Sequence, residues 1–398
     1  MTRLPRLLLL LLLFLAPLVA CGGYGAPARW AGRIDTLPSG VVVVRNPAQG
    51  LWDEDAGWSV REELRIGSAL SEGPDLFGSV AGIAVDGRGR IHVLDRQAKE
   101  LRTFAPDGRH VRTVGREGGG PGEFRDPIGL AAGPDGETLY VVDPRNARYA
   151  VFSMDAEPRT QFQRAVGGYS LPWDGGFDAA GRFHENVFAA GGHAVLVMDS
   201  GFQPADTARF PGFEAEEFVL TTESGRISTT VPFAPDQVER WDPRGYLWTA
   251  RTGEYTLTRM DMEGDTVRVI HGPPVPPIPV TEADRDEALE GLEWFRRQGG
   301  RVDPGRIPSA KPPVSTFHVA ADGHIWVRLT GPADEVGARY HVFDPEGRFL
   351  GTVTTAEGLG SAPVFTDGAV YGVVRDSLGV QYIVRNALRD GAVAGDGD

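Results

Sequence analysis

The sequence is poor in cysteine, in positive charge and in long apolar runs, and each absence excludes a class of protein. One cysteine among 398 residues excludes a disulfide framework and a Cys-rich zinc site. Lys and Arg number 40 against 54 Asp and Glu, and the resulting net charge of −14 argues against a nucleic-acid-binding surface. Beyond the N-terminal segment no run of about 18 apolar residues occurs, so no later membrane-spanning helix is predicted.

Glycine and proline, in contrast, are abundant. The chain holds 53 glycines and 30 prolines, close to a fifth of all residues, against a usual share of roughly 12%. Hydrophobic residues still make up 41%, enough for a packed core, and no Gly-x-y period occurs. A core combined with so many turn formers predicts an all-β protein of many short strands.

The N-terminus has the pattern of a targeting segment. Arg3 and Arg6 precede an apolar stretch (7–15) that is too short to span a bilayer, which is typical of a secretory signal peptide over residues 1–20. The run Leu18-Val19-Ala20-Cys21 resembles the lipobox of bacterial lipoproteins. The resemblance implies cleavage before Cys21 and lipid on its thiol and new amino group, which would anchor an exported protein to a membrane.

An ordinary signal peptide that ends by chance in a cysteine is the alternative. Gly22 follows the cysteine, whereas in the lipoprotein family an aspartate there favours retention in the inner membrane. If the source is Gram-negative, we therefore expect the outer membrane. The stretch 21–40 is rich in Gly, Ala and Pro and is predicted to be a tether.

A repeat runs through the rest of the chain. Residues 82–124, and again those from 129 on, give strand, Asp-Gly turn, strand, charged loop, strand, tight turn and strand in succession. The strands alternate with period two, so each copy is predicted to be a four-stranded antiparallel meander. The glycine of the first turn recurs at Gly89, Gly136, Gly181, Gly245, Gly323 and Gly368. Six such units are typical of a six-bladed β-propeller.

The two ends of the repeat region are predicted to meet in one blade. The last copy, residues 364–388, supplies three strands rather than four. The segment Trp58–Ile66 has the alternation of an outer strand, and we expect it to complete the sixth blade and close the ring. Residues 41–45 are predicted to form a further strand, and the sequence does not indicate which blade this strand joins. The propeller is therefore predicted over residues 41–398.

Two long spacings between the turn glycines locate insertions. Residues around 213–236 are predicted to add a hairpin between blades 3 and 4. Residues 273–313 add a proline run and a helix between blades 4 and 5, with Thr281 as N-cap and Asp284 completing a capping box. Connections between blades share one face with the loops that join second to third strands. We expect the insertions to wall or cap that face; covering a blade flank is the alternative.

The first two copies resemble NHL repeats, and the chain is similar to bacterial six-bladed β-propeller lipoproteins of NHL-like type. The likeness covers most of residues 58–388 and includes the linker 115–124. In such repeats an aspartate, here Asp95 or Asp143, typically braces a loop by accepting backbone N–H bonds. Later copies carry other residues at that position, so the family implies the fold better than the chemistry.

The patterns that propeller enzymes use are mostly missing. Of the eight histidines only His318 lies on a predicted inner strand, and no H-x-x-H spacing matches the histidine-bound metal of the related peptide-amidating lyases. Four asparagines are few for the oxygen ligands of a lactonase-type calcium site. No G-x-S-x-G occurs, and the glycine-rich stretch 115–122 lacks the Lys-Ser/Thr of a P-loop. We therefore expect no zinc, calcium or other cofactor, and a metal-dependent lyase or lactonase using the central channel is the alternative function.

The candidate binding residues are polar or aromatic side chains that break the repeat near the strand ends of one face. They are Trp173, Asn186, Arg240, Arg251, His318 and Arg328. Guanidinium forks bind carboxylates or phosphates, and tryptophan stacks on sugars or apolar rings. We expect a ligand-binding or scaffold protein that takes a polar or anionic small molecule at the axial mouth, and the residues indicate no particular reaction. A platform for a protein partner is the other class that stays open.

Overall fold

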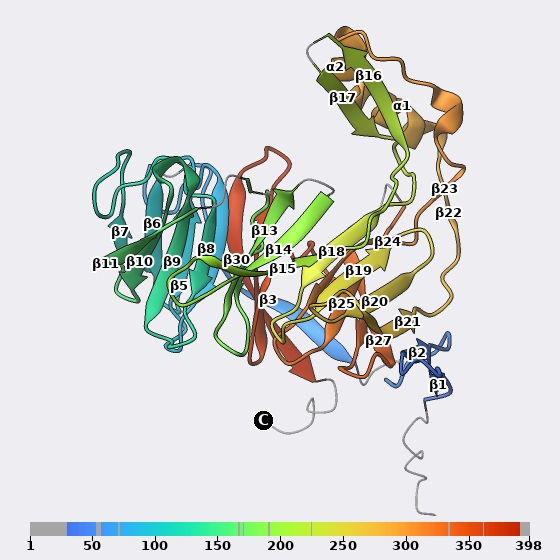
Figure 1. The fold of residues 1–398 in the computed structure, drawn as a ribbon, viewed down its shortest axis with the longest axis horizontal. Helices are drawn as coiled ribbons and strands as arrows, with labels where there is room; N and C mark the ends of the chain where they lie inside the picture. Colours follow the sequence, from blue (N-terminus) through green and yellow to red (C-terminus); the bar gives the residue numbers. More distant parts are fainter. Residues whose placement is uncertain are drawn as a thin grey trace, which may run out of the picture.

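The computed structural model describes residues 30–52, 57–70, 72–165, 168–169, 171–189, 192–223, 225–332, 335–360 and 362–390, so the predicted signal peptide and Cys21 lie outside the described residues. The described chain folds into six blades of at least four strands each, which confirms the predicted all-β six-bladed propeller. In Figure 1 the blue-green and green strands of blades 1 and 2 lie on the left, β30 and β3 of blade 6 lie near the middle, and the yellow strands of blade 4 lie on the right.

Blades 1 to 3 are regular antiparallel meanders. Blade 1 contains β4 (Val80–Val85), β5 (Ile91–Asp95), β6 (Glu100–Phe104) and β7 (His110–Val114). Blade 2 contains β8 (Gly129–Ala132), β9 (Thr138–Asp143), β10 (Arg148–Ser153) and β11 (Pro158–Gln163), with the 3-10 helix η1 (Pro144–Asn146) between β9 and β10. Blade 3 contains β12 (Gly176–Phe177), β13 (Phe183–Ala189), β14 (Gly192–Met198) and β15 (Pro204–Arg209).

Blades 4 to 6 follow the same plan. Blade 4 contains β18 (Gln237–Trp241), β19 (Leu247–Arg251), β20 (Thr256–Met260) and β21 (Thr266–His271). Blade 5 contains β24 (Val314–Val319), β25 (Ile325–Leu329), β26 (Ala338–Phe343) and β27 (Phe349–Thr355). Blade 6 contains β28 (Val364–Thr366), β29 (Ala369–Arg375), β30 (Gln381–Asp390) and β3 (Trp58–Ile66).

The turn glycines and the buried strand ends explain why the repeat folds in this way. All six turn glycines have φ between +66° and +93°, a region that residues with a Cβ rarely adopt. In five blades the third strand ends in a side chain that is at most 3% exposed: Phe104, Phe152, Met198, Met260 and Phe343. Each of these side chains packs into a cluster shared with a neighbouring blade, which buries the faces of the meanders.

Strand β3 closes the ring as predicted. It pairs antiparallel with β30, from Trp58 opposite Asp390 to Ile66 opposite Ile383. Ile66 is 4% exposed and belongs to an apolar cluster that also contains Phe104 of blade 1. Segments more than 300 residues apart in sequence thus share one sheet, and β3 covers the edge that β30 would otherwise leave free.

The N-terminal segment also reinforces blades 4 and 5. Strand β2 (Val42–Arg45) pairs in parallel with β21, and β1 (Arg33–Thr36) pairs with β2, so blade 4 has six strands. The predicted tether therefore ends before residue 33, because residues 33–36 cover the free edge of β2. The chain then crosses blade 5, where the Leu51 and Trp52 amides donate to backbone carbonyls of β27 at 3.1 and 2.7 Å.

The two insertions form one small unit, which we call the insertion module (residues 217–311 without blade 4). It contains the predicted hairpin, β16 (Glu217–Thr222) and β17 (Gly225–Thr230), and the pair β22 (Ile278–Pro279) and β23 (Ala310–Lys311). Its helices are α1 (Glu282–Gly291), α2 (Glu293–Arg297) and the 3-10 helix η2 (Pro304–Arg306). The predicted capping box is confirmed, because the Asp284 amide donates to the Thr281 hydroxyl and the Thr281 amide to the Asp284 carboxylate.

The module buries its apolar side against itself. Phe218 of the hairpin, Leu292 and Phe295 of the helical segment and Ile307 are all at most 6% exposed and form one cluster. Figure 1 shows the module standing away from the blades, at the upper right. The two insertions thus share one apolar core, which leaves Val219 and Trp294 as the module's large apolar side chains that are exposed among the described residues. In the part of the chain that the structure describes, no helix has the length and apolar character needed to cross a membrane.

Replacement of Ile66 by alanine tests the closure of the ring. We expect Ile66→Ala to lower the free energy of unfolding by about 2–5 kcal/mol, because it removes a buried side chain at the joint between blades 6 and 1. Arg61→Ala, an exposed change on the same strand, should stay within about 0.5 kcal/mol. Equilibrium denaturation measures both, and equal effects would contradict the closure.

Candidate functional site

A cavity of about 610 Å³ opens at the axial mouth, on the face with the inter-blade connections. Three of the predicted residues line it: Asn186 from blade 3, Arg240 from blade 4 and Arg328 from blade 5. Leu171 and Pro172, in the connection from blade 2 to blade 3, line both this axial cavity and an adjoining one of about 320 Å³. None of the described residues of the insertion module lines the axial cavity, whereas Ile278, Ala310 and Lys311 of the module line a larger cavity beside blade 5.

Arg240 is held by blade 5. Its Nε donates to the Phe317 carbonyl at 3.2 Å, and its Nη2 donates to the Thr316 hydroxyl at 3.0 Å. Burial lowers the pKa of Arg240, and the negative charges of Asp174 and Glu239 oppose that effect. The guanidinium is thus fixed on the cavity wall, where its hydrogen bonds join blade 4 to blade 5.

Arg328, in contrast, carries a charge that the protein does not balance. It lies opposite Thr316 in the register of β24 and β25 and is half-buried. Among the described residues it has no hydrogen-bond or ion-pair partner. A guanidinium that has lost part of its hydration without gaining a partner is ready to bind a carboxylate or phosphate.

The lining of the cavity is also acidic and polar. The Asn186 amide nitrogen donates to Asp174 Oδ1 at 2.7 Å, and burial raises the pKa of the Asp174 carboxyl. Glu239 lies 2.8 Å from Nδ1 of His193, and this hydrogen bond raises the pKa of the imidazole. The cavity therefore offers guanidinium groups together with hydrogen-bonding carboxylates and an amide.

The other three predicted residues lie outside this cavity. His318 is 5% exposed, and burial lowers the pKa of its imidazole to about 3, with the charges of Arg240 and Arg328 acting in the same direction. Trp173 is 4% exposed, packs between blades 2 and 3 and lines the adjoining cavity. Arg251 is not among the residues that line the axial cavity; its side chain is exposed and lies 3.6 Å from Glu254.

Sequence reasoning missed Asp174, Glu239, His193 and Thr316 as lining residues. The reason is geometric: an inner strand turns its edge toward the axis, so consecutive side chains such as Glu239 and Arg240 both reach the cavity. A search for repeat-breaking residues on one face of each strand finds only one of the two. The sequence offered one clue to these residues, namely that two of them are neighbours of predicted site residues: Asp174 directly follows Trp173, and Glu239 directly precedes Arg240.

The loop-bracing role expected for two repeat aspartates is confirmed. Asp95 accepts the amides of Gly78, Ser79, Gln97 and Ala98, which belong to the incoming connection and the following loop. Asp143 accepts the amides of residues 125 and 126. The stretch 115–122 lies between β7 and β8, as expected for an inter-blade turn.

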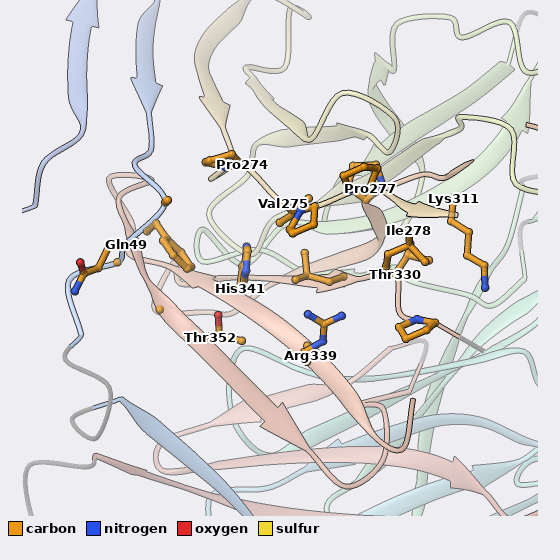
Figure 2. A pocket seen from close by; sticks show the side chains of 18 of the residues that line it. Gln49, Pro274, Val275, Pro277, Ile278, Lys311, Thr330, Arg339, His341 and Thr352 are labelled. Atoms are coloured by element: carbon orange, nitrogen blue, oxygen red, sulfur yellow. The ribbon is translucent and has the colours of Figure 1, made fainter. Parts of the chain in front are cut away.

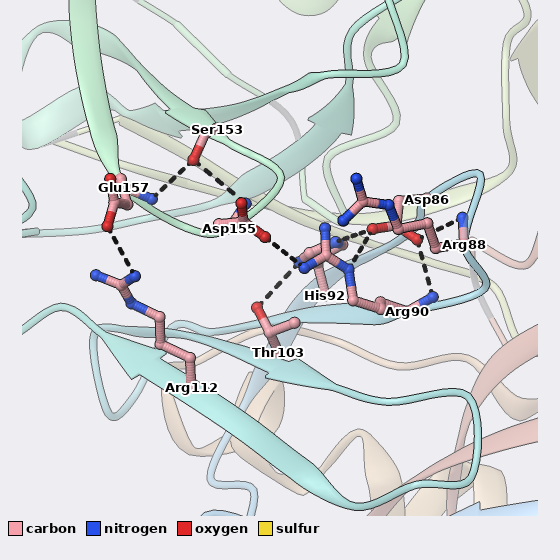
Figure 3. Close-up of polar contacts among 9 residues, drawn as sticks. All are labelled: Asp86, Arg88, Arg90, His92, Thr103, Arg112, Ser153, Asp155 and Glu157. Atoms are coloured by element: carbon pink, nitrogen blue, oxygen red, sulfur yellow. Dashed lines mark hydrogen bonds and ion pairs between the residues drawn. The ribbon is translucent and has the colours of Figure 1, made fainter.

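The histidines are dispersed among the blades. Figure 3 shows His92 inside blade 1, where Nδ1 lies 3.1 Å from the Thr103 hydroxyl and Nε2 lies 3.4 Å from Asp86. Asp86 also pairs with Arg90, which reaches Asp155 of blade 2 at 2.6 Å. Burial lowers the pKa of His92, so it serves this network as a neutral group. Nowhere in the described chain do three His, Cys, Asp or Glu side chains gather closely enough to hold a metal ion.

A larger cavity of about 1120 Å³ lies beside blade 5 and contains none of the predicted residues. Figure 2 shows Arg339, His341 and Thr352 on one side of it and Pro274 and Pro277 of the proline run on the other. His341 Nδ1 lies 2.7 Å from the Tyr255 hydroxyl, and burial lowers the pKa of His341 to about 4. Lys311 and Arg339 are paired with Asp284 and Glu335, so these two cations are already neutralised.

Comparisons with known proteins agree with the architecture. Residues 75–163 match the family DUF5128, described as a 6-bladed beta-propeller. A Bacteroides fragilis protein provisionally designated as exported superposes with a TM-score of 0.50 at 11% identity, covering 87% of this chain and 99% of that one. The chain is thus a six-bladed β-propeller, and at such identity the likeness shows the fold alone.

Two enzymes are among the more distant structures. Virginiamycin B lyase from Staphylococcus aureus superposes with a TM-score of 0.44 at 9% identity, covering 83% of this chain and 100% of that one. A gluconolactonase from Xanthomonas campestris superposes with a TM-score of 0.41 at 14% identity, covering 84% and 98%. No curated protein sequence matches the chain.

The His193–Glu239 contact should make stability depend on pH. Because the folded-state pKa of His193 lies above the ordinary 6.5, the contact contributes fully below that pH and is lost as pH rises through the folded-state value. We expect the melting temperature of the wild type to exceed that of His193→Gln by more at about pH 5.5 than at about pH 8.5. His110→Gln on β7 is the control, and a gap that is constant with pH would contradict the contact.

Proposed function

We propose that the protein is an exported, lipid-anchored binding protein that holds a polar or anionic small molecule in the axial cavity. The observation that carries the proposal is the half-buried guanidinium of Arg328, which has no partner among the described residues, in a cavity of about 610 Å³. A pocket of this size with a few convergent polar groups is the usual form of a small-molecule site. The convergence of Asn186, Arg240 and Arg328 from three blades supports the same view.

The charges of the cavity support a ligand with an acid group at one end. A carboxylate could accept both terminal N–H groups of Arg328, a geometry that adds specificity as well as affinity. Hydroxyl or amine groups at the other end of the ligand could donate to Asp174 and Glu239. We therefore favour hydroxylated or amino-substituted carboxylic acids over simple inorganic anions.

A protein partner on the same face is the second candidate. Loop tips on the face of the axial cavity carry large apolar side chains with little cover: Leu70 is 96% exposed, Leu171 51%, Val336 91% and Leu378 83%. Exposed apolar side chains on one face are typical of interaction surfaces. A metal-dependent lyase or lactonase has no such support, because in the described chain the cavity lacks a cluster of metal-binding side chains.

Replacement of Arg328 tests the axial site. Sugar acids, amino acids and dicarboxylates that raise the melting temperature of the wild type are first selected by thermal shift and then titrated by calorimetry. We expect Arg328→Gln to weaken binding of these carboxylates roughly 10- to 100-fold, since a hydrogen-bonded charge pair contributes about 1.5–3 kcal/mol. Binding should also weaken as ionic strength rises.

Arg251→Gln is the matched control, because Arg251 is also an arginine at the end of a second strand but lies outside the cavity. Its affinity for the carboxylates should equal that of the wild type. Equal losses in the two variants would contradict an axial site. Failure of every carboxylate to bind the wild type would favour the protein partner instead.

The lipid anchor has its own test. In the full chain expressed in a bacterial host, we expect Cys21→Ser to abolish incorporation of a labelled fatty acid and to move the protein from the membrane to the soluble fraction. Gly22→Asp should keep the label and, in a Gram-negative host, shift the protein toward the inner membrane. Retention of the label in Cys21→Ser would refute the anchor.

A further inference from the structure

A second, smaller cavity lies between blades 5 and 6 at the opposite end of the strands. It has a volume of about 380 Å³ and is lined by Trp58, Trp326 and Phe365 together with two strand-connecting turns, residues 320–322 and 366–368. Both turns join a first strand to a second strand, so they lie on the face away from the inter-blade connections. We call this cavity the aromatic slot.

Three aromatic rings build the floor and walls of the slot. Trp58 and Trp326 have ring centroids 5.7 Å apart with planes inclined by 26°, and Phe365 lies 5.6 Å from Trp326. Trp326 is 1% exposed, whereas Trp58 and Phe365 are half-buried, so Trp326 forms the floor. The faces of such rings carry negative charge density and attract cations.

The mouth of the slot is acidic. Asp322 and Asp367 are the charged residues that line it, and no lysine or arginine is among the described lining residues. Asp367 is exposed and has neither a hydrogen bond nor an ion pair within the described chain. Asp322 lies 2.9 Å from Nδ1 of His324, and this contact is the first cause of its lowered pKa, with the charge of Arg244 as a smaller one.

We propose that the aromatic slot binds a small organic cation of the alkylammonium class. A neutral apolar ligand would fill the space between the rings, but it would remove water from the carboxylates at the mouth without offering them a hydrogen bond or a positive charge. A metal ion would find two carboxylates and no third ligand, since no group of three metal-binding side chains occurs among the described residues. An alkylammonium group suits both the aromatic rings and the acidic mouth, because its alkyl groups contact the rings while its positive charge faces Asp367. The net charge of −14 of the protein also attracts a cation.

The test compares choline with 3,3-dimethylbutan-1-ol, which has the same shape without the charge. Calorimetric titration of the folded full-length propeller should give binding of choline that is at least roughly tenfold tighter than binding of the neutral alcohol. Raising the salt concentration should weaken the binding of choline and leave that of the alcohol unchanged. Equal binding of the two compounds, or binding of neither, would overturn the proposal.

Two substitutions locate the binding. Asp367→Asn removes a carboxylate that has no structural partner, so the fold should be unaffected, and choline binding should weaken roughly fivefold. Phe365→Leu keeps an apolar side chain and removes a ring, which should weaken binding of choline more than that of the neutral alcohol.

Asp107→Asn is the control, since Asp107 also lies in a strand-connecting turn and accepts the amide of residue 109, but it is remote from the slot. Its affinity for choline should match that of the wild type. An affinity of Asp367→Asn equal to that of Asp107→Asn would place choline elsewhere and refute the slot. The axial carboxylate experiments do not affect this outcome, because the two cavities share no lining residue.

Discussion

The antiparallel pairing of β3 with β30 is the interaction on which the rest of the structure depends. Without it blade 6 would have three strands, β30 would have a free edge, and the apolar cluster that Ile66 shares with Phe104 of blade 1 would lose a buried side chain. The same N-terminal segment then reaches β27 and β21, so it holds the last three blades from outside. The cavities between blades keep their shape because the blades that form them cannot separate.

Much of this fold could be predicted from the sequence because it rests on local rules. The six turn glycines, the period-two strands and the spare strand Trp58–Ile66 each have a physical cause that a short segment reveals. The axial cavity could be predicted only in part, because its lining depends on which blades meet across the axis. Arg251 is the last residue of β19 and is exposed, whereas Arg328 is the penultimate residue of β25 and lines the cavity, so a shift of one position along equivalent strands changes what a side chain faces.

The insertions show why composition alone misjudges position. Their apolar residues could have packed on the propeller, but Phe218 and Phe295 come from different insertions and bury each other. The buried ion pair between Lys311 and Asp284, at 2.7 Å, connects β23 to the N-terminus of α1. This ion pair lowers the pKa of Asp284 to about 2. A unit with its own core needs no support from the blades, which explains why the described residues of the module leave the axial cavity to residues of blades 3, 4 and 5 and of the connections into blades 3 and 6.

One strand connects the two binding sites. On β25, Arg328 lines the axial cavity and Trp326, two residues earlier and thus about 7 Å away, forms the floor of the aromatic slot. Their cross-strand partners on β24 are Thr316 and the buried His318, whose Nε2 has no hydrogen-bond partner among the described residues. Because Trp326 is fully packed, a ligand at either site meets a preformed wall and loses little free energy in ordering it. The two sites therefore differ in the sign of the charge they leave unpaired, Arg328 at one and Asp367 at the other, and this difference decides which ligand each one selects.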